Sequence, residues 1–216
     1  MPDYFKLSTG NFAQDWSNTA LLSATDDWSR VTGIVGYRGD DITSATGANP
    51  GTLTGDGTVT IDVNVNQVNP NTNTTGGVTE FEIANPVVAL QGSGTADAPS
   101  LVFHLDTTGR EQVVFSFNAP DIDGSPDKPA QQIAVQYRVG VSGAWINLPA
   151  GYIADATSAG SATQSTAVSV TLPASVNGQS QVQVRVITAN AVGNDEWVGI
   201  DDILVTSQPQ TVGPIL

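Results

Sequence analysis

Hydrophobic and polar residues alternate with a period of two along most of this chain. Residues 58–68, TVTIDVNVNQV, place Val59, Ile61, Val63 and Val65 on one face and threonine, aspartate and asparagine on the other. Such alternation is typical of a β-strand with one buried face, and helical spacing is almost absent. The same pattern recurs in residues 78–90, 100–107, 111–120, 131–140, 143–149, 165–173, 179–189 and 197–207.

Glycine, proline, asparagine and aspartate separate these segments, which together predict about nine or ten strands. The sequence therefore indicates an all-β fold, a two-sheet antiparallel β-sandwich of the jelly-roll type. We expect residues 1–208 to form a single domain and residues 209–216 to begin a linker or tail. Residues 11–57 are less regular, and long polar loops of this kind often bind ligands or are held by ions.

The charge balance narrows the possible partners. The 216 residues include 21 acidic and 7 basic ones, for a net charge of −14, and no cysteine. This balance opposes binding to nucleic-acid phosphates and to anionic lipid, and the absence of cysteine excludes disulfides. An acidic, oxygen-rich surface suits a hard cation such as Ca²⁺. No signal peptide or membrane-spanning run is apparent, so for an exported protein either the signal is missing from this sequence or the address lies elsewhere, for example at a C-terminus beyond it.

Several segments carry a family resemblance, among them GNFAQDWSNTALLSATDDWSRVTGIVGYRGDD (10–41), FEIANPVVALQGSGTADAPSLVFHLDTTGR (81–110) and NAVGNDEWVGIDDILVTS (190–207). Together with IDGSPDKPAQQIAVQYRVG and LPAGYIADAT, they resemble the accessory β domain of large bacterial extracellular nucleases and phosphatases, which often carry RTX calcium repeats. The resemblance implies secretion, a bacterial extracellular or cell-surface location, and a catalytic domain elsewhere. The closing WVGIDDI is similar to the last strand of calcium-containing jelly-roll modules.

The aspartate pair within this last segment raises a question of burial. Asp201 and Asp202 lie between Ile200 and Ile203, and a buried carboxylate is costly unless a partner compensates it. Either a β-bulge re-aims one side chain, or both face water at the strand's end, or a structural calcium holds them. We expect calcium, with Asp201 as the principal ligand because it matches the jelly-roll position.

A second acidic segment could complete such a site. Asp121, Asp123 and Asp127 surround a glycine turn in DIDGSPD, a spacing that resembles part of a calcium loop but also occurs in plain turns. Residues 26–28 and the RGDD segment that ends at Asp41 are further candidates, and the sequence does not decide among them.

Candidate chemistry beyond calcium is sparse. His104 is the single histidine and alternates with apolar neighbours, so the usual zinc sites are excluded, and no G-x-S-x-G nucleophile elbow is present. We therefore expect no enzymatic activity from this chain. Trp145 follows a predicted hairpin turn, where it would either cover the sheet or stack against a glycan.

These observations predict a non-catalytic, calcium-stabilised extracellular accessory module of a secreted or surface protein. Two alternatives stay open. A self-assembling surface-layer or filament subunit would bind other copies of itself through a large complementary patch or an unpaired edge strand. A carbohydrate-binding module would present an exposed aromatic shelf beside a groove.

Overall fold

A computed structural model of the chain describes residues 3–211. Within this range the chain forms thirteen β-strands and five single-turn 3-10 helices, and no α-helix. The 3-10 helices are η1 (Leu7–Thr9), η2 (Thr19–Leu21), η3 (Pro50–Thr52), η4 (Pro70–Thr72) and η5 (Ala174–Val176).

One sheet has six strands. Its order is β1-β7-β12-β9-β10, and β3 also pairs with β7. The bounds are β1 (Phe5–Lys6), β3 (Ile34–Tyr37), β7 (Ser100–Asp106), β9 (Ile133–Val139), β10 (Ile146–Ile153) and β12 (Val182–Ile187).

The other sheet has seven strands. Its order is β11-β8-β13-β6-β5-β4, and β2 also pairs with β13. The bounds are β2 (Phe12–Gln14), β4 (Asn64–Gln67), β5 (Gly77–Phe81), β6 (Val87–Gln91), β8 (Arg110–Pro120), β11 (Ser165–Thr171) and β13 (Val198–Pro209).

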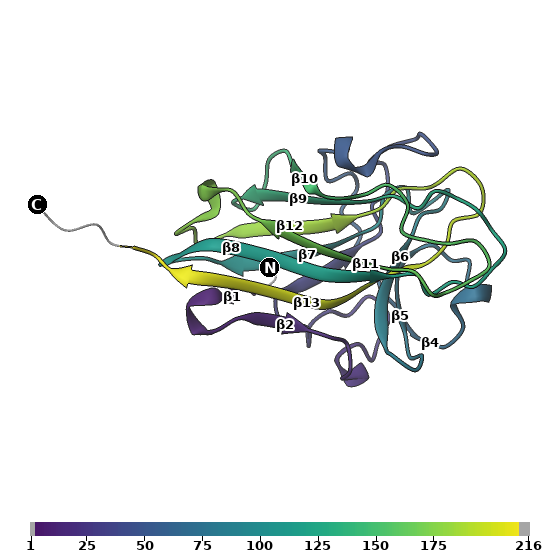
Figure 1. Ribbon diagram of the computed structural model, residues 1–216, viewed down its shortest axis with the longest axis horizontal. Helices are drawn as coiled ribbons and strands as arrows, with labels where there is room; N and C mark the ends of the chain where they lie inside the picture. The colour runs from purple at the N-terminus through teal and green to yellow at the C-terminus, as the bar shows by residue number, and fades with distance from the viewer. Residues whose placement is uncertain (1–2, 212–216) are drawn as a thin grey trace, which may run out of the picture.

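The predicted fold class is confirmed: the chain is a β-sandwich of the jelly-roll type, with long strands that run along the molecule and loops gathered at one end (Figure 1). All strand pairs are antiparallel except β1 with β7 and β4 with β5. The last strand, β13, ends at Pro209, and beyond it Thr211 still donates a hydrogen bond to Glu111. Residues 212–216 of the predicted tail lie outside the described range.

The core lies between the two sheets because alternate residues of each strand point inward. On β7 these are Leu101, Phe103 and Leu105, each fully buried. Phe103 meets Phe115 of β8 in the opposite sheet edge to face, with ring centroids 4.9 Å apart. Burying one such aromatic side chain stabilises the fold by roughly 1.5–3 kcal/mol.

The prediction for residues 58–68 was wrong in part. Val63 and Val65 are buried, but Val59 and Ile61 are 65% and 47% exposed. The strand is confined to β4, which pairs parallel to β5 with a shift in register and with Asn66 at φ 57°. The irregular backbone before and within β4 therefore ends the alternation that the sequence pattern implied.

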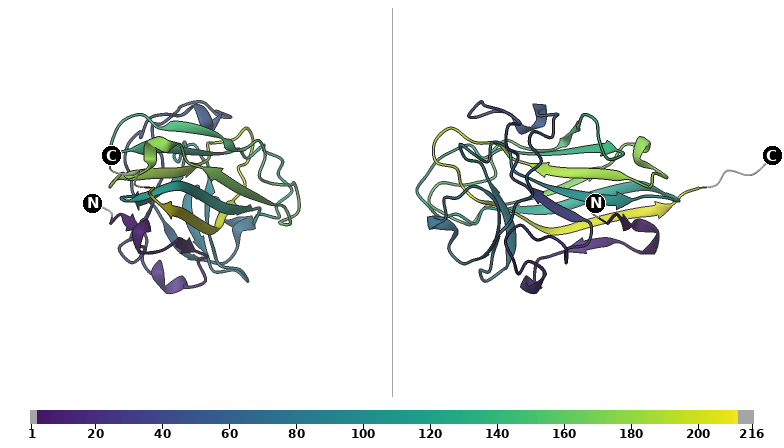
Figure 2. Two further views of the ribbon diagram at one scale, coloured as in Figure 1. Left: turned by 60° about the vertical axis from the view of Figure 1, so that its left-hand side comes forward. Right: turned by 180° about the vertical axis from the view of Figure 1, so that it is seen from behind.

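The chain that leaves β3 turns across the outer face of the six-stranded sheet. This segment includes η3, which packs beside β9 and β10, as the dark blue ribbon in Figure 2 shows. The turn depends on Gly39, whose φ is +75°, because a Cβ there would overlap the carbonyl oxygen of Ala98.

Replacing Gly39 by alanine should therefore destabilise the protein more than the same change at Gly109. Both glycines have positive φ, +75° and +71°, a conformation that costs an alanine about 1–2 kcal/mol. Only Gly39 lies against other backbone, since a Cβ at Gly109 meets nothing within 4 Å. In urea unfolding, we expect a loss near this conformational cost for Gly109→Ala and a clearly larger loss for Gly39→Ala. Equal losses in the two variants would contradict a packing role for Gly39.

Candidate functional site

The outer face of the six-stranded sheet carries polar side chains in register. Gln183 of β12 lies between His104 of β7 and Arg138 of β9. In the next row along the strands, Arg185 lies between Val102 and Gln136. These residues face away from the core because their neighbours in sequence, such as Val182 and Val184, fill it. The alternation of the strands thus places two arginines on one sheet face.

Arg185 is almost fully buried and has a partner for each guanidinium nitrogen. Its Nε donates to Oε1 of Gln136 at 2.6 Å, its Nη1 donates to the carbonyl oxygen of Gly55 at 2.9 Å, and its Nη2 donates to that of Leu53. Burial lowers the pKa of Arg185 to about 9, and the nearby Asp56 opposes this shift. The segment 53–56 is therefore tied to the sheet by a buried charge.

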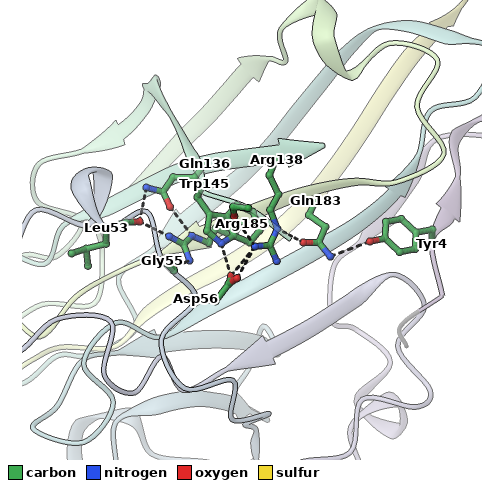
Figure 3. Close-up of polar contacts among 10 residues, drawn as sticks. Tyr4, Leu53, Gly55, Asp56, Gln136, Arg138, Trp145, Gln183 and Arg185 are labelled. Atoms are coloured by element: carbon green, nitrogen blue, oxygen red, sulfur yellow. Dashed lines mark hydrogen bonds and ion pairs between the residues drawn. The ribbon is translucent and has the colours of Figure 1, made fainter. Parts of the chain in front are cut away.

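Arg138 makes the second set of bonds. Its Nη1 forms an ion pair with Asp56 at 2.7 Å, and its Nε donates to Gln183, which in turn donates to the hydroxyl of Tyr4 at 3.0 Å. Figure 3 shows two sets of hydrogen bonds, one around Arg185 and the other running from Trp145 through Asp56, Arg138 and Gln183 to Tyr4, and the ring of Trp145 contacts both guanidinium groups. Within each set, hydrogen bonds that share partners orient one another and restrict the motion of the side chains.

Trp145 completes this cluster. Its indole nitrogen donates to Asp56 at 2.7 Å, and the guanidinium carbons of Arg138 and Arg185 lie 4.2 and 4.5 Å from its ring centroid. The ring is only 2% exposed. The structure thus places Trp145 in a packing position of the kind the sequence allowed, and the ring is no exposed shelf.

A groove of about 330 Å³ opens beside this cluster. Tyr4 and Tyr37 are half-buried in its wall, and the exposed Val59 and Val141 lie at its rim. Its polar groups come from the three central strands β7, β9 and β12 and from the segment between β3 and β4, which covers this face of the sheet. They are Asp56, Ser100, His104, Arg138, Gln183 and Arg185.

Two side chains of the groove, His104 and Asp56, have well-defined charge states near neutral pH. Burial lowers the pKa of His104 to about 4, so its imidazole is neutral, and its Nδ1 is buried without a hydrogen-bond partner among the described residues. Burial alone would raise the pKa of Asp56, but the hydrogen bonds from Arg138 and Trp145 hold it below the ordinary value. Near neutral pH the groove therefore presents a neutral His104 and an ionised Asp56.

The predicted calcium ligands on β13 lie elsewhere. The pairing of β13 with β8 shifts register between Asp201 and Leu204, and Asp202 has φ 47°, so a bulge re-aims the two carboxylates. Asp201 is buried and accepts hydrogen bonds from the side chain of Asn85 at 2.7 Å and from the Asp202 backbone N–H at 2.8 Å. Burial still raises the pKa of Asp201 above its ordinary value.

Asp202 and Asp41 both have protein partners. Asp202 is exposed and accepts from the side chain of Asn118 at 2.9 Å. Asp41 accepts from the hydroxyl of Thr58 at 2.6 Å, and its backbone N–H donates to Asp97. The first bond joins β13 to β8, and the bonds of Asp41 hold the loop that follows β3.

The remaining predicted ligands form a separate cluster. Asp121 pairs with Val198 in an isolated bridge, whereas Asp201 pairs with Asn118 three residues away, a separation of about 10 Å along the strands. Asp121 accepts backbone N–H bonds from Asp123 and from Ser158. Loop 121–127 is therefore next to the beginning of β13, and Asp201 is not.

Sequence reasoning missed the most unusual residue of this cluster, Glu196. Its side chain is fully buried, and neither carboxylate oxygen has a well-formed hydrogen bond with a described residue, although the hydroxyl of Thr157 lies near. Burial raises the pKa of Glu196 to about 7, and the charges of Asp121, Asp123 and Asp127 add to this. The only signal in the sequence was a glutamate directly before a buried tryptophan, and an acidic residue in a loop is too common to be informative.

As they stand in residues 3–211, no three histidine, aspartate or glutamate side chains are gathered closely enough to hold a metal ion. In the same range, no helix is both long and apolar enough to cross a membrane.

Comparisons with known proteins establish no family for this chain: no family model and no curated sequence matches it. Several solved structures are similar at low identity. A carbohydrate-binding module specific for non-crystalline cellulose is 15% identical, with a TM-score of 0.41 over 69% of this chain and 99% of its own. A Stig cyclase from Fischerella sp. TAU is 12% identical, with a TM-score of 0.45 over 94% and 100%. The K2 cleaved adhesin domain of Lys-gingipain is 16% identical, with a TM-score of 0.44 over 92% and 98%.

The charge state of His104 leads to a prediction about pH. Since burial holds the folded pKa near 4 while the unfolded value is about 6.5, His104 should cost stability as pH falls from about 6.5 to 4. Relative to His104→Gln, the parent should lose up to about 3 kcal/mol of unfolding free energy across this range. Urea unfolding of both proteins at several pH values measures the difference. Parallel pH profiles would show that the folded protein protonates His104 freely.

Proposed function

We propose that this chain is a carbohydrate-binding module, a non-catalytic accessory part of an exported bacterial protein, with its ligand in the groove on the six-stranded sheet. The proposal rests on the combination of aromatic, apolar and hydrogen-bonding surfaces within one groove. Tyr4 and Tyr37 offer aromatic rings, and Val59 and Val141 extend the apolar surface. Fixed hydrogen-bond donors and acceptors lie between them.

This combination suits a sugar, which presents apolar C–H faces and a ring of hydroxyl groups. Binding sites for such ligands are mostly apolar, with a few polar groups that fix orientation. The hydroxyl of Tyr4 and the side chains of Gln183 and Arg138 form one connected row, so their positions are set before a ligand arrives. Preorganisation of this kind reduces the entropic cost of binding. The volume of about 330 Å³ suits one end of a glycan or a short oligosaccharide.

The charge states support binding over acid–base catalysis. A general acid or base works best with a pKa near the operating pH. In the groove, Asp56 is held ionised by Arg138 and Trp145, and His104 is neutral well below pH 7. Both groups are suited to hydrogen bonding with hydroxyls.

The test compares two tyrosines. Tyr4 lines the groove, whereas Tyr152 on β10 is exposed and hydrogen-bonded to Gln132 outside it. A glycan array with the purified chain identifies an oligosaccharide, and calorimetry measures its affinity. We expect Tyr4→Ala to weaken binding about tenfold through the lost aromatic contact, and Tyr152→Ala to leave it unchanged.

An equal loss in both variants would place the glycan outside the groove. Failure of all neutral and acidic oligosaccharides to bind, with an apolar small molecule binding instead, would overturn the proposed ligand class.

A further inference from the structure

Four acidic residues, Glu196 and the aspartates 121, 123 and 127, lie on two segments that run side by side at the beginning of β13. Backbone pairing fixes this arrangement, because Asp121 lies opposite Val198 and the N–H of Ile122 donates to the carbonyl oxygen of Trp197. Asp123 and Asp127 follow on the same loop and act electrostatically on Glu196. The cluster thus brings one loop and the start of the last strand together.

Glu196 is the member that protein contacts do not explain. The three aspartates accept hydrogen bonds from the loop itself, from Ser158 or from Asn194. The two carboxylate oxygens of Glu196 are buried without such partners. Buried polar groups in native proteins are almost always partnered by protein, water or an ion.

Positive charge from the protein does not fill this role. The ion pairs among residues 3–211 are Arg38 with Asp40 and Arg138 with Asp56, and both lie apart from the cluster. Lys128, which follows Asp127, forms no ion pair with any described residue. A proton or a metal cation from solution is the remaining source of compensating charge.

The surroundings are rich in oxygen ligands of the kind that Ca²⁺ prefers. A hollow of about 340 Å³ adjoins the loop and is lined almost entirely by polar residues, which include Asp195, the neighbour of Glu196 in sequence, but neither Glu196 nor Asp121. Asp123, Asp127 and Asp195 supply carboxylates to it. Amide oxygens come from Asn71, Asn73, Asn190 and Asn194. Calcium commonly completes its shell of six to eight oxygens with such carbonyl groups and water.

We propose that Glu196 anchors a calcium ion which binds between the start of β13 and loop 121–127. Asp121, Asp123 or Asp127 supplies further carboxylate oxygens, and amide or backbone carbonyl oxygens and water complete the shell. Because no three acidic side chains converge among residues 3–211, the proposal requires the loop side chains to shift toward the ion. Calcium then joins the loop to the last strand.

The experiment uses the whole chain after treatment with EGTA. Thermal melts with calcium, and with magnesium as a control for charge screening, compare the parent with Glu196→Gln and Asp201→Asn. At about a hundredfold excess over Kd, calcium should raise the Tm of the parent by roughly 5–10 °C. We expect the same rise in Asp201→Asn, which removes a buried carboxylate of β13 outside the cluster, and none in Glu196→Gln.

Terbium luminescence gives a second readout that is independent of stability. A terbium ion bound at Glu196 would lie beside Trp197, whose emission should sensitise it, and calcium should displace it. Asp127→Asn alters a half-buried loop residue, and we expect at least tenfold weaker binding even if Glu196→Gln does not fold. The proposal is overturned if the parent shows no calcium response, if Glu196→Gln responds like the parent, or if Asp201→Asn is the variant that loses the response.

Discussion

Two guanidinium groups buried on the outer face of the six-stranded sheet determine how the segments around them are arranged. Burying a charge costs several kcal/mol unless hydrogen bonds and an opposite charge compensate it. Arg185 meets this requirement with the carbonyl oxygens of Leu53 and Gly55, and Arg138 meets it with Asp56. The segment 53–56 must therefore lie across the sheet, and Trp145 packs where both cations and Asp56 can contact it. The groove is the space that remains beside this cluster.

The charges of the carboxylates are compensated differently from those of the arginines. With 21 acidic and 7 basic residues, most acidic side chains have no cation to pair with. Many accept hydrogen bonds from backbone N–H groups or from asparagine instead, as Asp121 and Asp201 do. Glu196 lacks this compensation although it is fully buried. The ion pair of Arg138 with Asp56 thus lines the groove, whereas Glu196 lies just before β13 without an ion pair to any described residue.

The alternation along the strands predicted the fold correctly because it records a local requirement. Each strand of the sandwich has one face in the core, as Leu101, Phe103 and Leu105 show on β7. The same reasoning failed at Val59 and Ile61, because these apolar residues lie in the segment between β3 and β4 and not in a strand. It also treated the polar face of β9 and β12 as a surface that faces water, whereas Gln136 and Arg185 on that face are buried under residues from another part of the chain.

By itself, the sequence determined the fold class, the positions of most strands, the acidity and the set of side chains that chemistry could use. Tertiary structure decided which of them meet. Asp201 obtains its partner from Asn85, 116 residues away, and Arg185 obtains one from Gly55, 130 residues away. No local pattern encodes such pairs. The residues that flank an aspartate or an arginine are the same whether or not a distant segment folds onto its side chain. For the same reason the aspartate pair that stands out in the sequence has partners, and Glu196, which does not stand out, lacks them.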